Sequence, residues 1–150
     1  MAIYYLETSA LVKLYVHEPG TVQMLRLAGA LGRNRFAALT LAQIEMRSAI
    51  RRRERAGDID SKRATMALHR LQLRLEREFI QQLVTDRVLE RAAQLIDRYF
   101  LRGYDAIQLA GCLILKVTLP GEPVTFVSAD KELVEAAESE RIAVFEPSGP

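Results

Sequence analysis

Cysteine, histidine and tryptophan are scarce in this 150-residue sequence, and the scarcity narrows the chemistry open to it. There are one cysteine, two histidines and no tryptophan. One cysteine forms no disulfide within the chain, and Cys112 lies in the apolar run Leu109–Leu115, so we expect a buried core residue and a reducing compartment. Neither His17 nor His69 stands at metal-ligand spacing from another histidine or cysteine, so both are interpreted as structural or surface residues.

Long apolar runs and glycine-rich phosphate-binding motifs are also missing. No run approaches the roughly 20 residues of a membrane-spanning helix, so no membrane association is expected. The apolar start Met1–Leu6 has no basic region and meets Glu7 at once, which predicts no secretory signal. A nucleotide-binding domain is disfavoured because Gly-x-Gly-x-x-Gly and Gly-Lys-Ser/Thr are absent. With 49% apolar and 27% charged residues, the sequence indicates a cytoplasmic globular protein with one domain over residues 1–150.

Short apolar runs alternate with helical patterns along the chain. The predicted strands are Ile3–Leu6, Phe36–Leu39, Leu83–Thr85, Val124–Val127 and Ile142–Phe145. The predicted helices are Ala10–Val16 after a Thr8 cap, Thr21–Ala30, Leu41–Arg55 after a Thr40 cap, Ile59–Phe79, Asp86–Tyr99 with Asp86 as its cap, Tyr104–Val117 and Asp130–Ser139. This alternation is typical of an α/β fold in which a parallel sheet is covered by helices on both faces.

Four acidic residues, Glu7, Glu45, Asp105 and Asp130, stand where such a sheet would bring them together. Glu7 ends the first strand, and Asp130 follows Val124–Val127 by three residues. Because the carboxyl ends of parallel strands share one edge, we expect the four carboxylates to converge there. Carboxylates that meet repel one another, and Mg²⁺ or Mn²⁺ would compensate them because both ions prefer oxygen ligands. The pattern predicts a metal site that could activate water and neutralise a phosphate.

Each acid also has an ordinary explanation when taken alone. Asp130 is a good helix N-cap, and Asp105 is a typical first-turn acid that favours the helix dipole. Glu45 could be a partly exposed helix residue, and Glu7 could pair with a neighbouring cation. The shared edge of the sheet is therefore what favours the metal-site interpretation.

Three hydroxyl residues, Thr8, Ser9 and Ser128, flank these acids. Their side chains could support a carboxylate or a metal-bound water from outside the ligand set. Helix capping explains Thr8 and Ser9 equally simply, and a turn explains Ser128.

Charge is unevenly distributed, although the net charge is only +2. Residues 46–78 carry ten Lys/Arg against five Asp/Glu, whereas residues 120–150 carry two against seven. The basic cluster Arg51–Arg55 could contact RNA phosphates, and the alternative is a set of ordinary solvated helix faces. The apolar surface of Ile59–Phe79 and Leu41–Arg55 predicts a groove that a second copy or a partner segment would cover. The few aromatic residues indicate no platform for stacking bases, so no sequence specificity is predicted.

Four short segments resemble, in order, the acidic motifs of PIN-domain proteins, and they place Glu7, Glu45, Asp105 and Asp130. The segments are Tyr5–Tyr15 (YLETSALVKLY), Leu41–Ile50 (LAQIEMRSAI), Arg102–Ala110 (RGYDAIQLA) and Phe126–Leu133 (FVSADKEL). The resemblance implies a three-layer α/β/α sandwich and a Mg²⁺- or Mn²⁺-dependent ribonuclease. The size of the chain and its long central helices resemble those of the toxin in a VapBC-type toxin–antitoxin pair. Such a toxin forms a homodimer and is inhibited by a small antitoxin protein, which often inserts a basic residue into the acidic site.

One residue departs from the family pattern, because Glu7 stands where the family usually has aspartate. Its side chain is one methylene longer, and magnesium demands near-ideal octahedral geometry. The departure keeps open a catalytically impaired PIN-like protein that binds RNA or a protein partner without cutting. A phosphohydrolase is a weaker alternative, because no Asp-x-Asp nucleophile pattern is present.

Overall fold

The computed structural model describes residues 1–149 and has a parallel five-stranded sheet at its centre. The strand order is β3-β2-β1-β4-β5. The strands are β1 (Ile3–Leu6), β2 (Arg35–Leu39), β3 (Ile80–Gln82), β4 (Val124–Val127) and β5 (Ala143–Phe145). The helices are α1 (Thr8–Leu11), the 3₁₀ turn η1 (Val12–Leu14), α2 (Thr21–Gly29), α3 (Ala42–Arg55), α4 (Ser61–Arg77), α5 (Asp86–Tyr99), α6 (Gly103–Thr118) and α7 (Lys131–Ser139).

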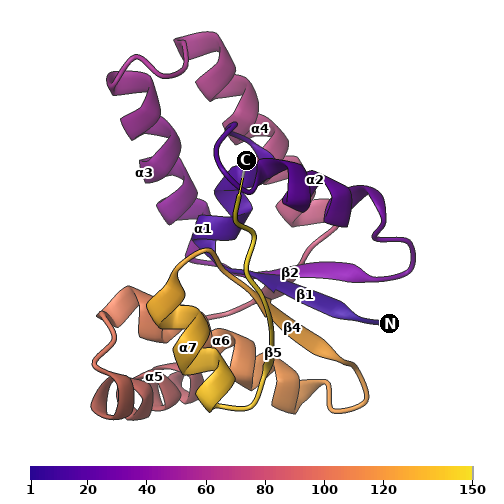
Figure 1. Ribbon diagram of the computed structural model, residues 1–150, viewed down its shortest axis with the longest axis vertical. Helices are drawn as coiled ribbons and strands as arrows, with labels where there is room; N and C mark the ends of the chain where they lie inside the picture. The colour runs from indigo at the N-terminus through magenta and orange to yellow at the C-terminus, as the bar shows by residue number, and fades with distance from the viewer. Residues whose placement is uncertain (150) are drawn as a thin grey trace.

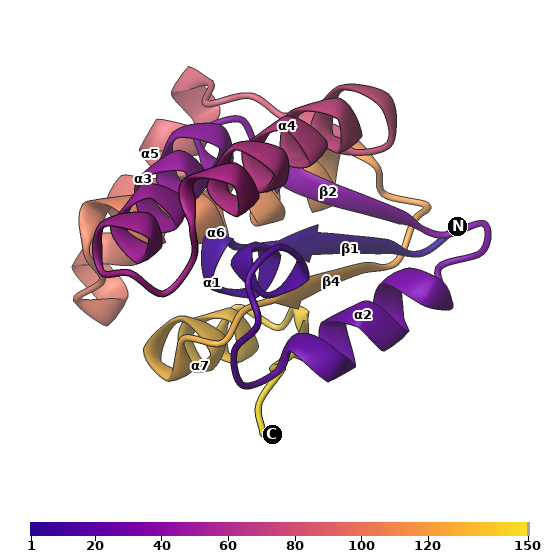
Figure 2. The ribbon, with the colours of Figure 1, turned by 90° about the horizontal axis from the view of Figure 1, so that it is seen from above.

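Helices cover both faces of the sheet, and the layers are seen in Figures 1 and 2. α1 to α4 share one buried cluster with one face of the sheet, and α5 to α7 share a second cluster with the other face. Helices α3 and α4 rise together away from the sheet (Figure 1). The fold is therefore a three-layer α/β/α sandwich, which confirms the predicted class.

The central strands are buried on both faces because their side chains alternate between the two clusters. In β1, Tyr5 packs toward α6, whereas Leu6 packs toward α1 and α3. In β2, Ala37 belongs to the same cluster as Tyr5, and Ala38 to the same cluster as Leu6. A strand with helices on both sides needs apolar residues at successive positions, which explains the continuous apolar runs in the sequence.

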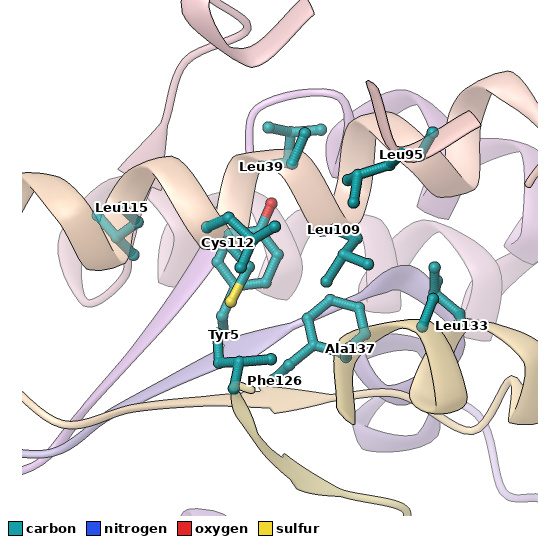
Figure 3. Close-up of a cluster of buried hydrophobic side chains, with 14 of the residues drawn as sticks. Tyr5, Leu39, Leu95, Leu109, Cys112, Leu115, Phe126, Leu133 and Ala137 are labelled. Carbon is teal, nitrogen blue, oxygen red and sulfur yellow. The ribbon is translucent and has the colours of Figure 1, made fainter. Parts of the chain in front are cut away.

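Helix α6 lies very close to the sheet because Gly111 has no side chain. A Cβ atom at this position would lie 2.5 Å from the Tyr5 hydroxyl and 2.7 Å from Leu39 Cδ1. Figure 3 shows Tyr5 and Cys112 in the layer between α6 and the sheet. Cys112 is a buried free thiol, as expected from its apolar surroundings.

The sheet has a topological switch point between β1 and β4, where successive strands change from one side of β1 to the other. The chain proceeds from β1 to β2 and β3 on one side, then returns to place β4 and β5 on the other. Parallel α/β sheets bind ligands where the carboxyl ends of two such strands diverge. Here the backbone N–H of Glu7 still donates to the Val127 carbonyl at 3.0 Å, so Glu7 stands at this point.

One predicted strand is wrong in position. The third strand is Ile80–Gln82, not Leu83–Thr85. Within residues 1–149, β3 is an edge strand that pairs only with β2, so Gln81 can occupy it without a buried polar penalty. Leu83, which favoured the wrong segment, lies outside the strand and is largely exposed.

Several predicted helix starts are also corrected. α1 begins at Thr8 itself and its N-cap is Glu7, whose side chain accepts from the Ser9 N–H. Thr40 does not cap α3, because the N-cap position is Leu41 and has no side-chain cap. α5 begins at Asp86, and the cap is Thr85.

None of the described helices is long and apolar enough to cross a membrane.

Candidate functional site

Glu7 is a buried carboxylate held by hydroxyl and amide groups. Its side chain is only 5% exposed. One oxygen, Oε2, accepts from the Ser9 N–H at 3.1 Å, from the Ser128 hydroxyl at 2.8 Å and from the Ser9 hydroxyl. Within residues 1–149, no hydrogen bond reaches the other oxygen, Oε1, and no salt bridge reaches Glu7.

Ser9 and Ser128 also tie the ends of β1 and β4 together. The Ser9 hydroxyl accepts from the Ala129 N–H at 2.9 Å, and the Ser128 hydroxyl accepts from the Asp130 N–H at 3.1 Å. The two serines that support Glu7 therefore also fix the backbone that carries Asp130. This network includes two of the three hydroxyl residues singled out from the sequence.

Glu45 lies in the first turn of α3 and is held from α6 by Gln108. The Gln108 amide nitrogen donates to Glu45 Oε1 at 2.8 Å and to the Thr8 hydroxyl at 3.0 Å. The amide must be oriented this way, because an ionised carboxylate only accepts hydrogen bonds. Gln108 is 1% exposed, and its oxygen has no hydrogen-bond partner in the described part of the chain. Thr8, the third flanking hydroxyl, thus meets Gln108 rather than an acid.

Asp105 and Asp130 form the other half of the acidic edge. Asp105 stands in the first turn of α6, and Asp130 is the N-cap of α7, where its Oδ1 accepts from the Leu133 N–H at 3.3 Å. Partial burial raises the pKa of Asp105, the charge of Asp130 raises it further, and Arg102 opposes the shift. The ordinary N-cap explanation of Asp130 is therefore correct, and it does not remove the carboxylate from the edge.

Burial also raises the pKa of Glu7, against the effect of its hydrogen bonds from Ser9 and Ser128. The charge of Glu45 raises the pKa of Glu7 further. The charges of Glu7 and Glu45 thus act on one another, as those of Asp105 and Asp130 do. Each pair places like charges near one another, which is unfavourable without a positive charge.

The four acids suit a divalent cation by type and location, but their spacing is not that of a metal centre. All the donors are carboxylate oxygens, the ligands that Mg²⁺ and Mn²⁺ prefer. Across residues 1–149, however, no three Asp, Glu, His or Cys side chains form a group that could hold an ion. Side-chain movement would be needed to complete a ligand set.

A small hollow opens beside Glu45. Its volume is about 370 Å³, and its lining residues are Thr8, Ile44, Glu45, Ser48, Ala49, Arg52 and Tyr104. Ile44 and Tyr104 are exposed although they are large and apolar or aromatic. The other three acids do not line this hollow, so it is not a pocket shared by all four predicted carboxylates.

A larger groove of about 1090 Å³ lies between α4 and the segment that follows α1. Its wall carries five arginines, Arg53, Arg63, Arg70, Arg74 and Arg77, and its apolar lining includes Leu14, Val16, Ile59, Met66 and Leu73. The main apolar stripe of α4 is not available to this groove, because it is buried in the protein's own core.

Two residues of the acidic edge were not identified from the sequence. Gln108 follows Asp105 by three positions on α6, and that helical spacing was the only signal of a shared face. Its partners Thr8 and Glu45 are 100 and 63 residues away along the chain, so the contacts of Gln108 with them could not be predicted from the sequence. Tyr104 directly precedes Asp105, and only the structure reveals that its ring is exposed.

Comparisons with known proteins agree with this fold. The sequence model of the PIN-domain family matches residues 4–139. No curated protein matches the sequence. Among solved structures, a chain of VapBC2 from Rickettsia felis bound to a promoter DNA fragment has a TM-score of 0.64 at 13% identity, over 96% of this chain and 98% of that one.

Two other solved structures show the same similarity of fold. PAE2754 from Pyrobaculum aerophilum has a TM-score of 0.64 at 18% identity, over 95% of this chain and 83% of that one. A toxin–antitoxin complex from Klebsiella pneumoniae has a TM-score of 0.64 at 16% identity, over 100% of both chains. The family-model match covers most of the sequence, and the protein therefore belongs to the PIN-domain family.

Proposed function

We propose that this protein is a divalent-metal-dependent endoribonuclease and the toxin of a toxin–antitoxin pair, acting in the cytoplasm. The observation that carries the proposal is a buried, uncompensated carboxylate at the switch point of the sheet. Glu7 is buried there with a raised pKa and without a cationic partner among residues 1–149. PIN-family membership supports a nuclease.

The proposed ligands of Mg²⁺ or Mn²⁺ are Glu7, Glu45, Asp105 and Asp130. A bound divalent ion would supply activated water and neutralise charge on the phosphate. Ser9 and Ser128 would orient the Glu7 carboxylate, and Thr8 would hold Gln108 in place. The free oxygen of Glu7 supports this assignment, because a carboxylate that already bonds through Oε2 can offer Oε1 to an ion.

The alternative is a PIN-like protein that binds RNA or a partner without cutting it. The feature that favours this alternative is Glu7, whose longer side chain folds back onto the Ser9 N–H as a helix cap. A carboxylate engaged in capping is less free to move toward an ion.

Cleavage of RNA distinguishes the two functions. The purified protein is incubated with mixed single-stranded RNA in EDTA, in Mg²⁺ and in Mn²⁺, with Asp105→Asn as the matched control. We expect cuts within the strand only with a divalent ion, and only by the wild-type protein. Binding without cleavage in either metal would favour the impaired alternative. Equal cleavage by Asp105→Asn would reject the assigned site.

We further propose a small antitoxin as partner, together with a homodimer. The K. pneumoniae structure of the same fold is a toxin–antitoxin complex, and the R. felis structure is VapBC2 bound to promoter DNA. The larger groove fits an antitoxin segment that combines acidic and apolar side chains, because its wall is basic and its lining partly apolar.

Co-expression with the product of the neighbouring gene tests the antitoxin proposal, and light scattering tests the dimer. We expect a stable complex that Arg70→Glu combined with Arg74→Glu disrupts, because both residues line the groove. Failure to recover any complex, or a complex indifferent to this charge reversal, would contradict docking in the groove. A strictly monomeric protein would contradict the homodimer.

A further inference from the structure

The small hollow beside Glu45 combines three kinds of surface that a nucleotide needs. The Tyr104 ring, 59% exposed, and Ile44 offer an aromatic and an apolar surface. Arg52 supplies a positive charge, and Thr8 and Ser48 supply hydroxyls. A volume of about 370 Å³ lies in the range of small-ligand sites, roughly 300–1,000 Å³.

The hollow is continuous with the acidic edge rather than a separate surface feature. Glu45 belongs to both, and Tyr104 directly precedes Asp105 at the start of α6. The inner wall is fixed, because the buried amide of Gln108 bonds to Thr8 and Glu45 together. On the outer side, the Arg52 guanidinium donates to the Ser48 hydroxyl at 3.3 Å, which restrains it beside the hollow.

We propose that this hollow binds one nucleobase of a single-stranded RNA, with the base stacked on Tyr104 and a flanking phosphate at Arg52. This inference rests on the proposed ribonuclease function and specifies how its substrate is placed. Aromatic rings bind bases through their faces and tolerate every base, while arginine binds phosphate oxygens. The neighbouring phosphodiester of the strand would then lie toward Glu45 and Asp105.

An RNA strand fits the hollow better than a second protein surface does. A negatively charged strand has to be attracted to an edge rich in carboxylates, and a cation beside the edge supplies that attraction. The hollow provides such a cation in Arg52, together with an exposed aromatic ring. A basic and apolar protein segment would be repelled by Arg52 at the same place.

RNA binding by variants of Tyr104 tests the inference. All proteins carry Asp130→Asn, which lies outside the hollow, so that the strand stays intact. Fluorescence anisotropy reports binding of a labelled RNA of about ten nucleotides, and of the same oligomer with abasic riboses. We expect Tyr104→Ala to weaken binding of the base-carrying RNA about tenfold and to leave binding of the abasic RNA unchanged.

Two matched variants sharpen the result. Tyr104→Phe keeps the ring and should restore most of the affinity. Phe100→Ala removes another exposed aromatic side chain, 92% exposed and outside the hollow, and should change neither affinity. Equal losses for both RNAs, no loss in Tyr104→Ala, or a similar loss in Phe100→Ala would overturn the base site. A shift of Tyr104→Ala from dimer to monomer in sedimentation would also overturn it, because a second copy would then cover the hollow.

Cleavage by the wild-type protein separates this inference from the function on which it rests. Base-dependent binding without cleavage would support the base site and reject the ribonuclease. Metal-dependent cleavage with an unchanged KM in Tyr104→Ala would reject the base site alone. If neither the base-carrying nor the abasic RNA binds, and the wild-type protein does not cleave RNA, both the base site and the ribonuclease function would be rejected.

Discussion

Two glutamates, the buried Glu7 and the partly buried Glu140, have opposite electrostatic surroundings. Glu140, at the end of α7, has a side chain 4% exposed and pairs with Arg91 and with Arg98, the latter at 2.8 Å. Tyr99 donates a further hydrogen bond. Burial alone would raise the pKa of Glu140, but these hydrogen bonds and charges outweigh burial and lower it.

Glu7 receives comparable hydrogen bonding from Ser9 and Ser128 but no cation from residues 1–149, and its pKa is raised. The comparison teaches that burial of an acid does not by itself indicate a site. Glu140 is neutralised from within and joins α5 to α7, whereas Glu7 leaves a negative charge that an external cation can compensate.

The largest expected effect is on catalysis. Glu7→Gln should lower metal-dependent RNA cleavage by about 1000-fold, roughly 4 kcal/mol of transition-state stabilisation, because a neutral amide neither attracts nor holds a divalent ion well. Glu140→Gln is the matched control and should leave the rate within about twofold. Initial cleavage rates of both variants in Mn²⁺ check the contrast. Similar rates for Glu7→Gln and the wild type would reduce the four-carboxylate site to three.

A smaller loss is expected when the support of Glu45 is removed. Gln108→Leu keeps the approximate size but deletes both hydrogen bonds, so activity should fall between about tenfold and 100-fold. The double variant Gln108→Glu with Glu45→Gln restores a donor–acceptor pair in reverse and should recover thermal stability but not activity. If the double variant recovers both, the pair is only structural.

Shortening the Glu7 side chain should have a weaker and opposite effect. Glu7→Asp should raise Mg²⁺-dependent cleavage up to about tenfold, because a shorter arm suits octahedral geometry in this family's pattern. Aspartate remains a good N-cap, so the bond to the Ser9 N–H can persist and the Tm without metal should change little. Thermal melts and steady-state kinetics measure the two quantities, and lower activity of Glu7→Asp would mean that the site has adapted to glutamate.

The smallest effects concern stability and pH, and they have opposite signs. A raised folded-state pKa means that Glu7 stabilises most below its unfolded pKa, and that this contribution is lost as pH rises through the folded value. Glu140 has a lowered pKa, so its contribution exists above the unfolded pKa and is lost as pH falls through the folded value.

Without metal, Glu7→Gln should therefore raise the free energy of unfolding by about 1 kcal/mol near neutral pH, and by less in acid. The facing Glu45 contributes to this gain. Glu140→Gln should lower it by about 1 kcal/mol near neutral pH, again by less in acid. Urea unfolding in EDTA at about pH 7.5 and about pH 4.5 measures both. Shifts of the same sign for the two variants would contradict the contrast.

The strands that are buried on both faces were predictable from the sequence, whereas the position of the edge strand β3 was not. Ile3–Leu6 and Val124–Val127 are mostly apolar because helices cover both of their faces, and their ends located Glu7 and Asp130. β3 was misplaced because an edge strand carries polar residues such as Gln81, while the apolar Leu83 beside it is exposed.

The acids of the site were predictable because strand ends and helix starts can be read locally. The contacts between them were not, since Gln108 meets Thr8 and Glu45 only after three separate elements pack together. The sequence likewise does not distinguish the surroundings of Glu7 from those of Glu140. Only the packing of α5 against the end of α7 brings Arg91 and Arg98 to Glu140.

The most direct test of the central claim is Mn²⁺ binding measured by electron paramagnetic resonance in the absence of RNA. We expect the wild type and Glu140→Gln to bind Mn²⁺ with the same affinity, whereas Glu7→Gln and Asp105→Asn should bind it at least about tenfold more weakly. Equal Mn²⁺ binding by all four proteins, or none by the wild type, would contradict the proposal that the acidic edge is a divalent-cation site.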